Sequence, residues 1–310
     1  SLLTADINAS NGTIHVVDQV IGLPSIVDHA IYNPDFSSLT VALIAEGLVE
    51  PLEEEGPFTV LAPVNDAFGD FSNPDGNLLS QILLNHVVPG AITSELLLES
   101  AETFTSTLAS GPNDAPISIY ANTSDGVRFN GVSSVSTADI IGTNGILHAV
   151  DGVIDIPTVV TFAAANPSFT SLVAALAEAD GSDADPMLIP TLSGEGPFTV
   201  FAPLNSAFDT LLNTNPAWDG VEDIDDNILN SVLLHHVVSG NVRSGDLVDG
   251  ISPATLEGDT ITINLPGTGG NIADVTDGAG NSDIGILAVD IQAGNGVIHV
   301  LNKVMLPVIE

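Results

Sequence analysis

Histidines in recurring contexts are the residues of this chain that invite a chemical role, because an imidazole can act as a metal ligand, a general base or a buried hydrogen-bonding group. His86 lies four residues after Ile82, and His236 lies four residues after Val232, so both fall on the apolar faces of predicted helices. A lone histidine on such a face is more often a core residue with both ring nitrogens hydrogen-bonded than a catalytic group. We therefore expect His86 and His236 to bond main chain near the Phe-Thr-Val segments described below, holding helix to strand.

The other histidines receive related interpretations. His15, His148 and His299 each lie in an apolar strand-like segment, and we expect them to be core residues as well. His235 lies one residue off the apolar face of its helix. We expect its side chain to be exposed, where it could contribute to a weak metal site.

Sequence motifs for catalysis are missing from the chain. It has no cysteine, no Gly-x-Ser-x-Gly elbow and no His-Glu-x-x-His zinc helix, and its only lysine, Lys303, does not stand in a phosphate-binding loop. Carboxylate pairs are too frequent among 40 acidic residues to single one out. We expect a protein that is not an enzyme and that carries no cofactor, with calcium as the one open possibility.

Calcium is considered because carboxylates gather in two short segments. Calcium takes about six to eight oxygen ligands from flexible loops. The candidates are Asp180, Asp183 and Asp185 in one segment and Asp223, Asp225 and Asp226 in the other. Neither set has EF-hand spacing, and a chain this acidic produces such clusters by chance, so calcium-dependent surface binding is kept as an alternative.

The charge balance limits the possible partners. The formal net charge is −37, with three basic residues. Such a chain repels nucleic-acid phosphates and anionic membrane surfaces. Because 44% of the residues are apolar, the acidity belongs to the surface of a folded protein, and we interpret it as adaptation to seawater or brine. No apolar run is long enough to suggest a membrane span.

Repeats organise the elements that position these residues. An Asn-Gly turn followed by an apolar strand containing one histidine occurs three times, at residues 11–18, 144–151 and 295–302. Its mostly apolar faces predict a central strand buried on both sides. A 13-residue element occurs only twice, at 56–68 and 196–208, with ten identical positions. Three closing strands and two openings predict that residues 1–24 are the C-terminal remnant of a preceding repeat, followed by domains at 25–157 and 158–310.

Within each repeat the pattern predicts helices and strands in the same order. Residues 26–32 favour a short helix, an apolar stripe follows that ends near Gly47, and residues 58–62 favour a strand. Asn65 and Asn205 follow this strand and its second copy, where we expect them to cap the next helix.

The second repeat contains a longer loop. Between the 13-residue element and the helix that carries His236 it has ten more residues than the first repeat, and the addition lies within residues 213–227. This acidic stretch holds Trp218, the only tryptophan. Trp218 is a candidate interaction residue if exposed, although a side chain folded onto the core is the simpler interpretation.

In combination these segments resemble fasciclin (FAS1) domains. Phe-Thr-Val-Leu-Ala-Pro-Val-Asn-Asp-Ala-Phe at 58–68 resembles the first family signature, Leu-Leu-Asn-His-Val-Val-Pro-Gly at 83–90 the second, and Asn-Gly-x-Ile-His-Val-x-Asp the closing strand. The resemblance implies an α+β fold, with each domain a wedge of two β-sheets and helices packed on one side. In some animal members a Tyr-His pair near the second signature is associated with integrin recognition. Here Asn85 and His235 precede the histidines, so integrin binding does not carry over.

The resemblance also implies a function. FAS1 domains are typical of secreted or cell-surface proteins that serve adhesion or matrix contact, so the expected partner is a protein or glycan at a surface. An alternative is binding of an apolar small molecule, a carotenoid or lipid, as in a few relatives. The unpaired edge of the first closing strand suggests a further possibility, self-association through residues 1–24.

Overall fold

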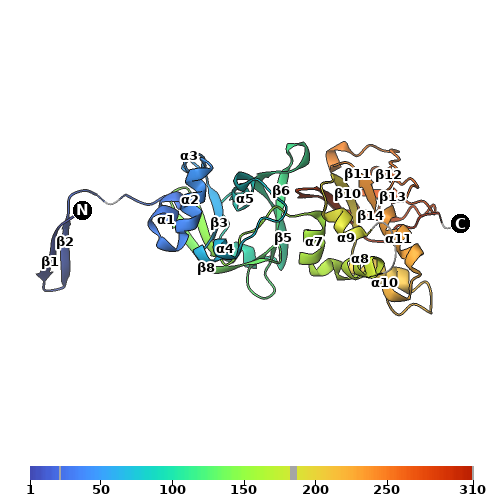
Figure 1. The fold of residues 1–310 in the computed structure, drawn as a ribbon, viewed down its shortest axis with the longest axis horizontal. Coiled ribbons are helices and arrows are strands. Elements are labelled where there is room, and N and C mark those ends of the chain that lie inside the picture. Colours follow the sequence, from blue (N-terminus) through green and yellow to red (C-terminus); the bar gives the residue numbers. More distant parts are fainter. Residues whose placement is uncertain (21, 182–186, 309–310) are drawn as a thin grey trace.

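The computed structural model describes residues 1–20, 22–181 and 187–308 (Figure 1). In these ranges the strands form a two-stranded sheet, a seven-stranded sheet and a six-stranded sheet. The first is a hairpin near the N-terminus, and each larger sheet belongs to one α+β domain (Figure 1). The expected tandem arrangement is therefore confirmed.

The first domain contains the elements predicted from its repeat. Its helices are α1 (Ile26–Tyr32), η1 (Pro34–Phe36), α2 (Ser37–Ala45), α3 (Val49–Leu52), α4 (Asn65–Asp70), α5 (Leu79–Asn85), α6 (Ser94–Leu98) and η2 (Pro112–Asp114). Its strands are β3 (Phe58–Pro63), β4 (Val87–Pro89), β5 (Glu102–Ser110), β6 (Pro116–Asn122), β7 (Arg128–Phe129), β8 (Ser133–Gly142) and β9 (Gly145–Val150), arranged in the order β4-β3-β9-β8-β7-β6-β5. Ser25 forms a capping box with Asp28 at the start of α1, and Gly47, with φ of +68°, follows the end of α2.

The closing strand β9 lies at the centre of this domain. It pairs in parallel with β3 and antiparallel with β8, and all six of its residues are buried, as predicted. Alternate side chains of the central strands enter two cores. Leu147 and Ala149 pack with the helices, whereas Leu61 and Val150 pack with Ile119 of β6. Helices therefore cover one face of the central strands, and the outer strands cover the other, which makes the wedge.

The second domain repeats this plan. Its helices are α7 (Val159–Ala165), η3 (Pro167–Phe169), α8 (Thr170–Gly181), α9 (Leu188–Ser193), α10 (Asn205–Leu212), η4 (Val221–Asp223), α11 (Asp226–His235) and η5 (Ser244–Asp246). Its strands are β10 (Phe198–Pro203), β11 (Val237–Ser239), β12 (Thr262–Asn264), β13 (Ala273–Thr276), β14 (Ile284–Ala293) and β15 (Gly296–Leu301), in the order β11-β10-β15-β14-β13-β12. β15 is buried along its whole length between β10 and β14.

The N-terminal copy of the closing strand has a different environment. β1 (Leu2–Ala9) and β2 (Gly12–Val17) form an antiparallel hairpin in which every residue is exposed. The prediction of a buried central strand is wrong for this copy, because no third strand lies against β2 among the described residues.

The two domains meet through a polar and aromatic contact. The ring of Phe104 on β5 packs edge-on against Phe162 of α7, with ring centroids 5.5 Å apart. The main-chain N–H of Gln292, on β14, donates to Ser118 Oγ of β6 at 3.0 Å. Tyr120 of β6 belongs to the same apolar cluster as the helices of the second domain, so this cluster is continuous across the domain boundary.

A helix that spans a membrane must be both long and apolar. In the described ranges no single helix is long and apolar enough to cross a membrane, and only α7 taken together with η3–α8, bent by 99°, reaches that composition and length.

Candidate functional site

His86 is held by main chain on both sides of its ring. Its Nδ1 lies 2.8 Å from the carbonyl oxygen of Ile82, and its Nε2 lies 2.9 Å from the main-chain nitrogen of Ile154. The N–H of Ile154 is a donor, so Nε2 must accept and Nδ1 must carry the proton that it donates to Ile82. The side chain is 2% exposed. A neutral imidazole in this tautomer uses both nitrogens.

His236 repeats the arrangement in the second domain. Its Nδ1 lies 2.7 Å from the carbonyl oxygen of Val232, and its Nε2 accepts from the N–H of Met305 at 2.9 Å. We expected the rings to bond main chain near the Phe-Thr-Val segments, and in this detail the prediction is wrong. The hydrogen bonds of the rings join their helices to the segments that follow β9 and β15. The main-chain carbonyls of His86 and His236 accept from the N–H groups of Leu61 in β3 and Phe201 in β10.

Burial determines the protonation of both residues. It lowers the pKa of His86 to about 4 and the pKa of His236 to about 4, while the bonds to Ile82 and Val232 oppose the shift in part. Both rings are therefore neutral at neutral pH. With each nitrogen already bonded, neither ring offers a free lone pair to a metal or a substrate proton.

Asn65 and Asn205 do not cap the helices that they begin. The N-caps of α4 and α10 are Val64 and Leu204, and neither makes a side-chain capping bond. Asn65 Oδ1 instead accepts from the N–H of Ser38 at 2.9 Å, and its Nδ2 donates to the carbonyl of Pro34 at 2.8 Å. The predicted capping role is wrong for α4, because the Asn65 side chain bonds the N-terminus of a neighbouring helix, α2.

Asn205 shows the same geometry one repeat later. Its Oδ1 accepts from the N–H of Ser171 at 2.9 Å, and its Nδ2 donates to the carbonyl of Pro167 at 2.9 Å. The first signature asparagine in each domain thus satisfies main-chain groups at the start of α2 or α8. Its contacts in the described structure are those of a structural residue.

The three closing-strand histidines divide by environment. His148 and His299 are buried, and their Nε2 atoms lie 2.9 Å from the carbonyl oxygens of Ile92 and Val242. His15 lies in the exposed hairpin, with 51% of its side chain accessible. The prediction of a core role is wrong for His15, because β2 lacks the neighbouring strand and loop that enclose the other two.

His235 is buried, which contradicts the predicted exposure. The helix α11 ends at this residue and the chain enters β11 two residues later, so two successive side chains, His235 and His236, both turn inward. The preceding repeat has Asn85 at this point, also fully buried, with Nδ2 donating to Asp155 O at 3.0 Å. The helical-face argument fails here because it assumes that the helix continues.

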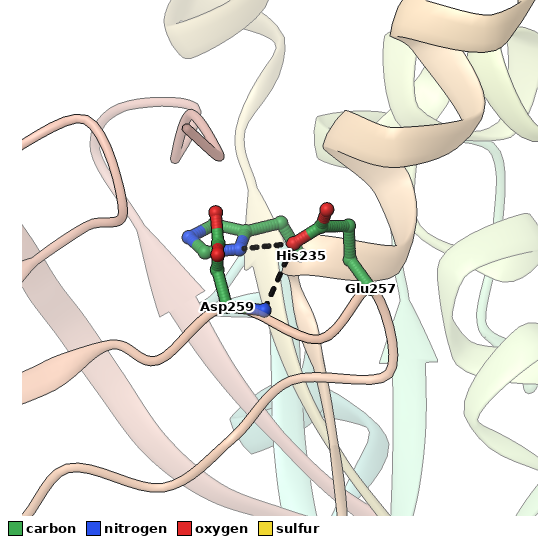
Figure 2. Close-up of side chains that lie close together, drawn as sticks. All are labelled: His235, Glu257 and Asp259. Atoms are coloured by element: carbon green, nitrogen blue, oxygen red, sulfur yellow. Dashed lines mark hydrogen bonds and ion pairs between the residues drawn. The ribbon is translucent and has the colours of Figure 1, made fainter. Parts of the chain in front are cut away.

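His235, Glu257 and Asp259 form a cluster with the types and spacing of metal ligands (Figure 2). His235 Nδ1 lies 3.5 Å from Glu257 Oε2, and Nε2 accepts from the N–H of Gly278 at 3.1 Å. A metal on Nδ1 would move the ring proton to Nε2, directly against that N–H. Asp259 Oδ2 is also engaged, by the N–H of Val308 at 2.7 Å. The donor set therefore does not fit a metal as it stands.

Burial and the neighbouring carboxylates act on the pKa of His235 in opposite directions. Burial lowers the pKa of His235, and the carboxylates of Glu257, Asp277 and Asp259 act in the opposite direction. Figure 2 shows the side chains of Glu257 and Asp259 beside the ring, and Glu257 also accepts from the main-chain N–H of Asp259. The polar contacts of this cluster join the end of α11 to the loop before β12.

The structure describes only part of the first calcium candidate segment. Asp183 and Asp185 lie outside the described residues. Asp180 accepts from the N–H groups of Leu188 and Ile189. In the ranges that the structure describes, the cluster around His235 is the only grouping of at least three histidine, aspartate or glutamate ligands.

The second acidic segment is likewise used locally. Asp223 accepts from the N–H groups of Asp219 and Gly220, and Asp225 caps α11 by accepting from Asn227 and Ile228. Asp226 lies in the first turn of α11, where a carboxylate suits the helix dipole. Each of these contacts has an ordinary role at a helix or turn.

Trp218 is half-buried. Its side chain packs against the core of the second domain and lines a small pocket with Leu211, Ile228 and Leu306. The acidic residues of the loop, such as Glu222 and Asp223, are exposed.

Comparison with known proteins places this geometry in a family. The model of the fasciclin domain matches residues 34–157 and, a second time, residues 167–307. The chain belongs to the fasciclin domain family. Its two complete repeats are FAS1 domains, and the hydrogen bonds of His86 and His236 are features of their shared framework.

Individual relatives support the assignment. The chain is 30% identical over 278 residues to the transforming growth factor-beta-induced protein ig-h3 of Sus scrofa, covering 84% of this chain and 36% of that protein. It is 37% identical over 141 residues to protein sll1483 of Synechocystis sp., covering 42% of this chain and 72% of that protein. The chain thus spans about a third of the length of ig-h3.

A solved structure shows the same fold. It is a FAS1 domain pair from the insect cell adhesion molecule fasciclin I, with a TM-score of 0.50 and 18% identity over 89% of this chain and 97% of that chain.

One residue of the FAS1 framework was recognised from the sequence only as a turn former. Asn144, in the turn before β9, accepts from the N–H of Ile26 at 3.0 Å and donates to the carbonyl of Leu52 at 2.8 Å. Asn295 makes the equivalent bonds to Val159 and Leu192. The recurrence of this asparagine in all three copies of the closing segment was the available signal.

The second FAS1 domain has a pocket of about 110 Å³ beside Trp218 and, in its core, an apolar cavity of about 30 Å³. The cavity lies between α7, α8 and α11 and the central strands, and His236 lines it together with Phe169 and Ile298. Both volumes are far below the roughly 300–1,000 Å³ of ligand pockets.

Proposed function

We propose that this chain is a non-catalytic adhesion module, in which tandem FAS1 domains present surfaces to a protein or glycan outside the cell. One observation carries the proposal. The polar signature side chains that could do chemistry, His86 and His236, already have both ring nitrogens bonded to main chain of their own domains. Groups used in this way stabilise a framework, which leaves the outer surface as the functional part.

The family relationship supports the class of function. The solved FAS1 pair belongs to a cell adhesion molecule, and the fold is shared over most of both chains. From this relationship we infer that the present chain is secreted or located at the cell surface. The polar cluster of His235, Glu257 and Asp259 does not favour catalysis, because the ring nitrogen opposite Glu257 is occupied by Gly278.

We further infer that the acidic surface is an adaptation to salt, as in a marine or halophilic microbe. The net charge of −37 is spread over a folded chain with three basic residues. At about 1 M salt the screening length falls to roughly 3 Å, so repulsion between exposed carboxylates becomes small.

Neither alternative gains support from a particular observation. The apolar cavity of about 30 Å³ and the pocket of about 110 Å³ beside Trp218 are both too small for a carotenoid or lipid. The described carboxylates of the calcium candidates are engaged by main-chain N–H groups or lie in the first turn of a helix.

Surface display tests the adhesion proposal. Bacterial cells displaying residues 1–310 at about 1 M sodium chloride are assayed for clumping and for retention on immobilised matrix proteins and glycans. We expect more clumping or retention than with cells displaying His236→Ala, in which the second domain is destabilised. Protease-resistant displayed protein with no retention and no clumping would argue against adhesion, as would substrate turnover that depends on His235.

A further inference from the structure

The exposed hairpin β1–β2 has the same local geometry as the closing hairpins of the two complete domains. Leu2 pairs with Val17 and Ile7 with Ile14, and the register shifts between them. In β14–β15 the corresponding pairs are Ile286 with Leu301 and Ile291 with Ile298, with register shifts at the same places.

A bulge residue confirms the equivalence. Asp6, Asp139 and Asp290 occupy the same position in the three hairpins, and each has a positive φ, of 58°, 59° and 63°. The N–H of Asp6 lies 3.3 Å from His15 Nδ1, as the N–H of Asp139 lies 3.2 Å from His148 Nδ1. The hairpin therefore keeps the shape of a closing hairpin, although no domain encloses it in the described structure.

The edge of β2 is open where a third strand belongs. In the complete domains the closing strand pairs in parallel with β3 or β10. Among the described residues β2 pairs only with β1. Apolar side chains of both strands lie in solvent, with Leu3 of β1 64% and Ile14 of β2 55% exposed. An isolated two-stranded hairpin is marginally stable in water, so this edge suits a parallel partner strand.

The connection after the hairpin has the same length as the connection between the two domains. Eight residues, 18–25, separate β2 from α1, and eight residues, 151–158, separate β9 from α7. The second connection allows the first domain to dock on α7. The first connection is therefore long enough to let a domain built on β1–β2 dock on α1 in the same way.

The face that would receive such a domain is exposed. On the second domain the corresponding face is covered by the first domain, and Phe162 and Gln292 are fully buried there. The equivalent position to Gln292 in the first domain is Ile141, which is 72% exposed, and Tyr32 at the end of α1 is 80% exposed. His29, which replaces Phe162, lies beside this isoleucine, with Nε2 at 3.1 Å from its carbonyl oxygen.

We propose that β1–β2 is the closing hairpin of a further FAS1 body, and that this body docks on the face formed by α1 and the end of β8. The occupant is a FAS1 body that supplies the parallel strand equivalent to β3 and the outer strands equivalent to β5 and β6. The contact of this further FAS1 body with the first domain differs from the contact between the two complete domains. Ile141 cannot make the side-chain hydrogen bonds of Gln292, so apolar contact with Tyr32 and Ile141 replaces them.

The chain offers a clean test because it has no cysteine. A copy of residues 25–133 is fused ahead of Ser1, so that β1–β2 can close it, and Ile141→Cys is introduced into the original first domain only. The rate of reaction with a thiol reagent is compared between the 310-residue chain and the extended chain. We expect labelling to slow by about tenfold or more in the extended chain, since the docked face must open before it reacts.

Two measurements make each outcome informative. Val41→Cys, on α2 and 68% exposed, should react at the same rate in both chains. Hydrogen exchange of the β2 amides should slow in the extended chain. Unprotected β2 amides would overturn the closing role of the hairpin, and protected amides with unchanged Ile141→Cys labelling would overturn the docking face.

Discussion

His236 accepts a hydrogen bond from the main-chain N–H of Met305 at 2.9 Å, across 69 residues of sequence. The same ring bonds Val232 within its own helix, so it joins α11 to the segment that follows β15. The contact between His86 and Ile154 repeats this link in the first domain. In each FAS1 domain one neutral imidazole thus links a helix to the segment that follows the closing strand.

Substitution of His236 by alanine should destabilise the second domain. The change leaves the N–H of Met305 without its acceptor and removes a buried side chain. We expect the free energy of unfolding of this domain to fall by about 2–5 kcal/mol. Thermal unfolding followed by Trp218 fluorescence reports that domain, because it holds the only tryptophan. His15→Ala, in the exposed hairpin, is the matched control and should leave the transition in place; an unchanged midpoint for His236→Ala would refute the linking role.

The same histidines should make stability depend on pH. Their folded pKa values of about 4 lie below the usual value near 6.5, so the unfolded state binds more protons between these values. The stabilisation is complete above the unfolded pKa and is lost as pH falls toward about 4. Between about pH 7 and pH 4.5 each histidine should cost roughly 2–3 kcal/mol.

A comparison of variants separates this effect from the carboxylates. Protonation of acidic groups over the same range alters the wild type and His236→Gln alike, so the difference between them isolates His236. Chemical unfolding at several pH values should give a shallower loss of stability for His236→Gln in the second domain. Parallel curves would contradict a buried neutral imidazole.

The order of elements was predictable because local pattern and tertiary structure agree. Helix α1 begins and ends where the pattern placed it, and β9 is central because both of its faces are apolar. Long-range partners were not predictable. Nothing in the neighbourhood of Asn65 indicates that its side chain serves Ser38 of another helix, and nothing near Asn144 points to Leu52.

The burial of His235 shows a second limit. A helical wheel assigns it to the outer face, but the helix ends there and the chain turns into β11. Its partners, Glu257 and Gly278, come from loops whose course no periodicity records. Terminal helix residues are thus where face assignment from sequence is least secure.

The interface between the domains should couple their unfolding. Phe104→Ala removes the ring that packs on Phe162. We expect fluorescence of Trp218 and far-UV circular dichroism to give coincident transitions in the wild type and separate transitions in the variant. Phe71→Ala, a half-buried residue at the end of α4, is the control and should lower the midpoint of both signals together. Coincident curves for Phe104→Ala would show that the aromatic contact carries no coupling.

Calcium should not bind specifically to the acidic loop. Asp223 and Asp225 hold main-chain N–H groups, and a calcium ion would compete with these bonds. Calorimetric titration at about 1 M sodium chloride, with Trp218 fluorescence followed in parallel, should give no saturable signal at millimolar calcium. A saturable signal that is absent with magnesium and lost in Asp223→Asn would establish the site and overturn this expectation.

Salt should stabilise the folded chain. Forty acidic residues face three basic ones, and within the described part of the chain only a few pairs, such as Lys303 with Asp283, offer local attraction. Exposed ion pairs contribute little, so screening weakens repulsion more than attraction. Raising sodium chloride from about 0.1 M to 1 M should increase the free energy of unfolding by about 2 kcal/mol, or roughly 4–8 °C in Tm.

Two experiments test why salt should raise the free energy of unfolding: a change of the cation and removal of surface carboxylates. Potassium chloride at equal ionic strength should act as sodium chloride does, because screening depends on ionic strength and not on a specific site. A variant with Glu54→Gln, Glu55→Gln and Glu99→Gln, all exposed carboxylates, should show a smaller salt dependence and a higher Tm at low salt. If the variant has the wild-type slope, surface repulsion is not what salt relieves, and the acidic surface needs another explanation.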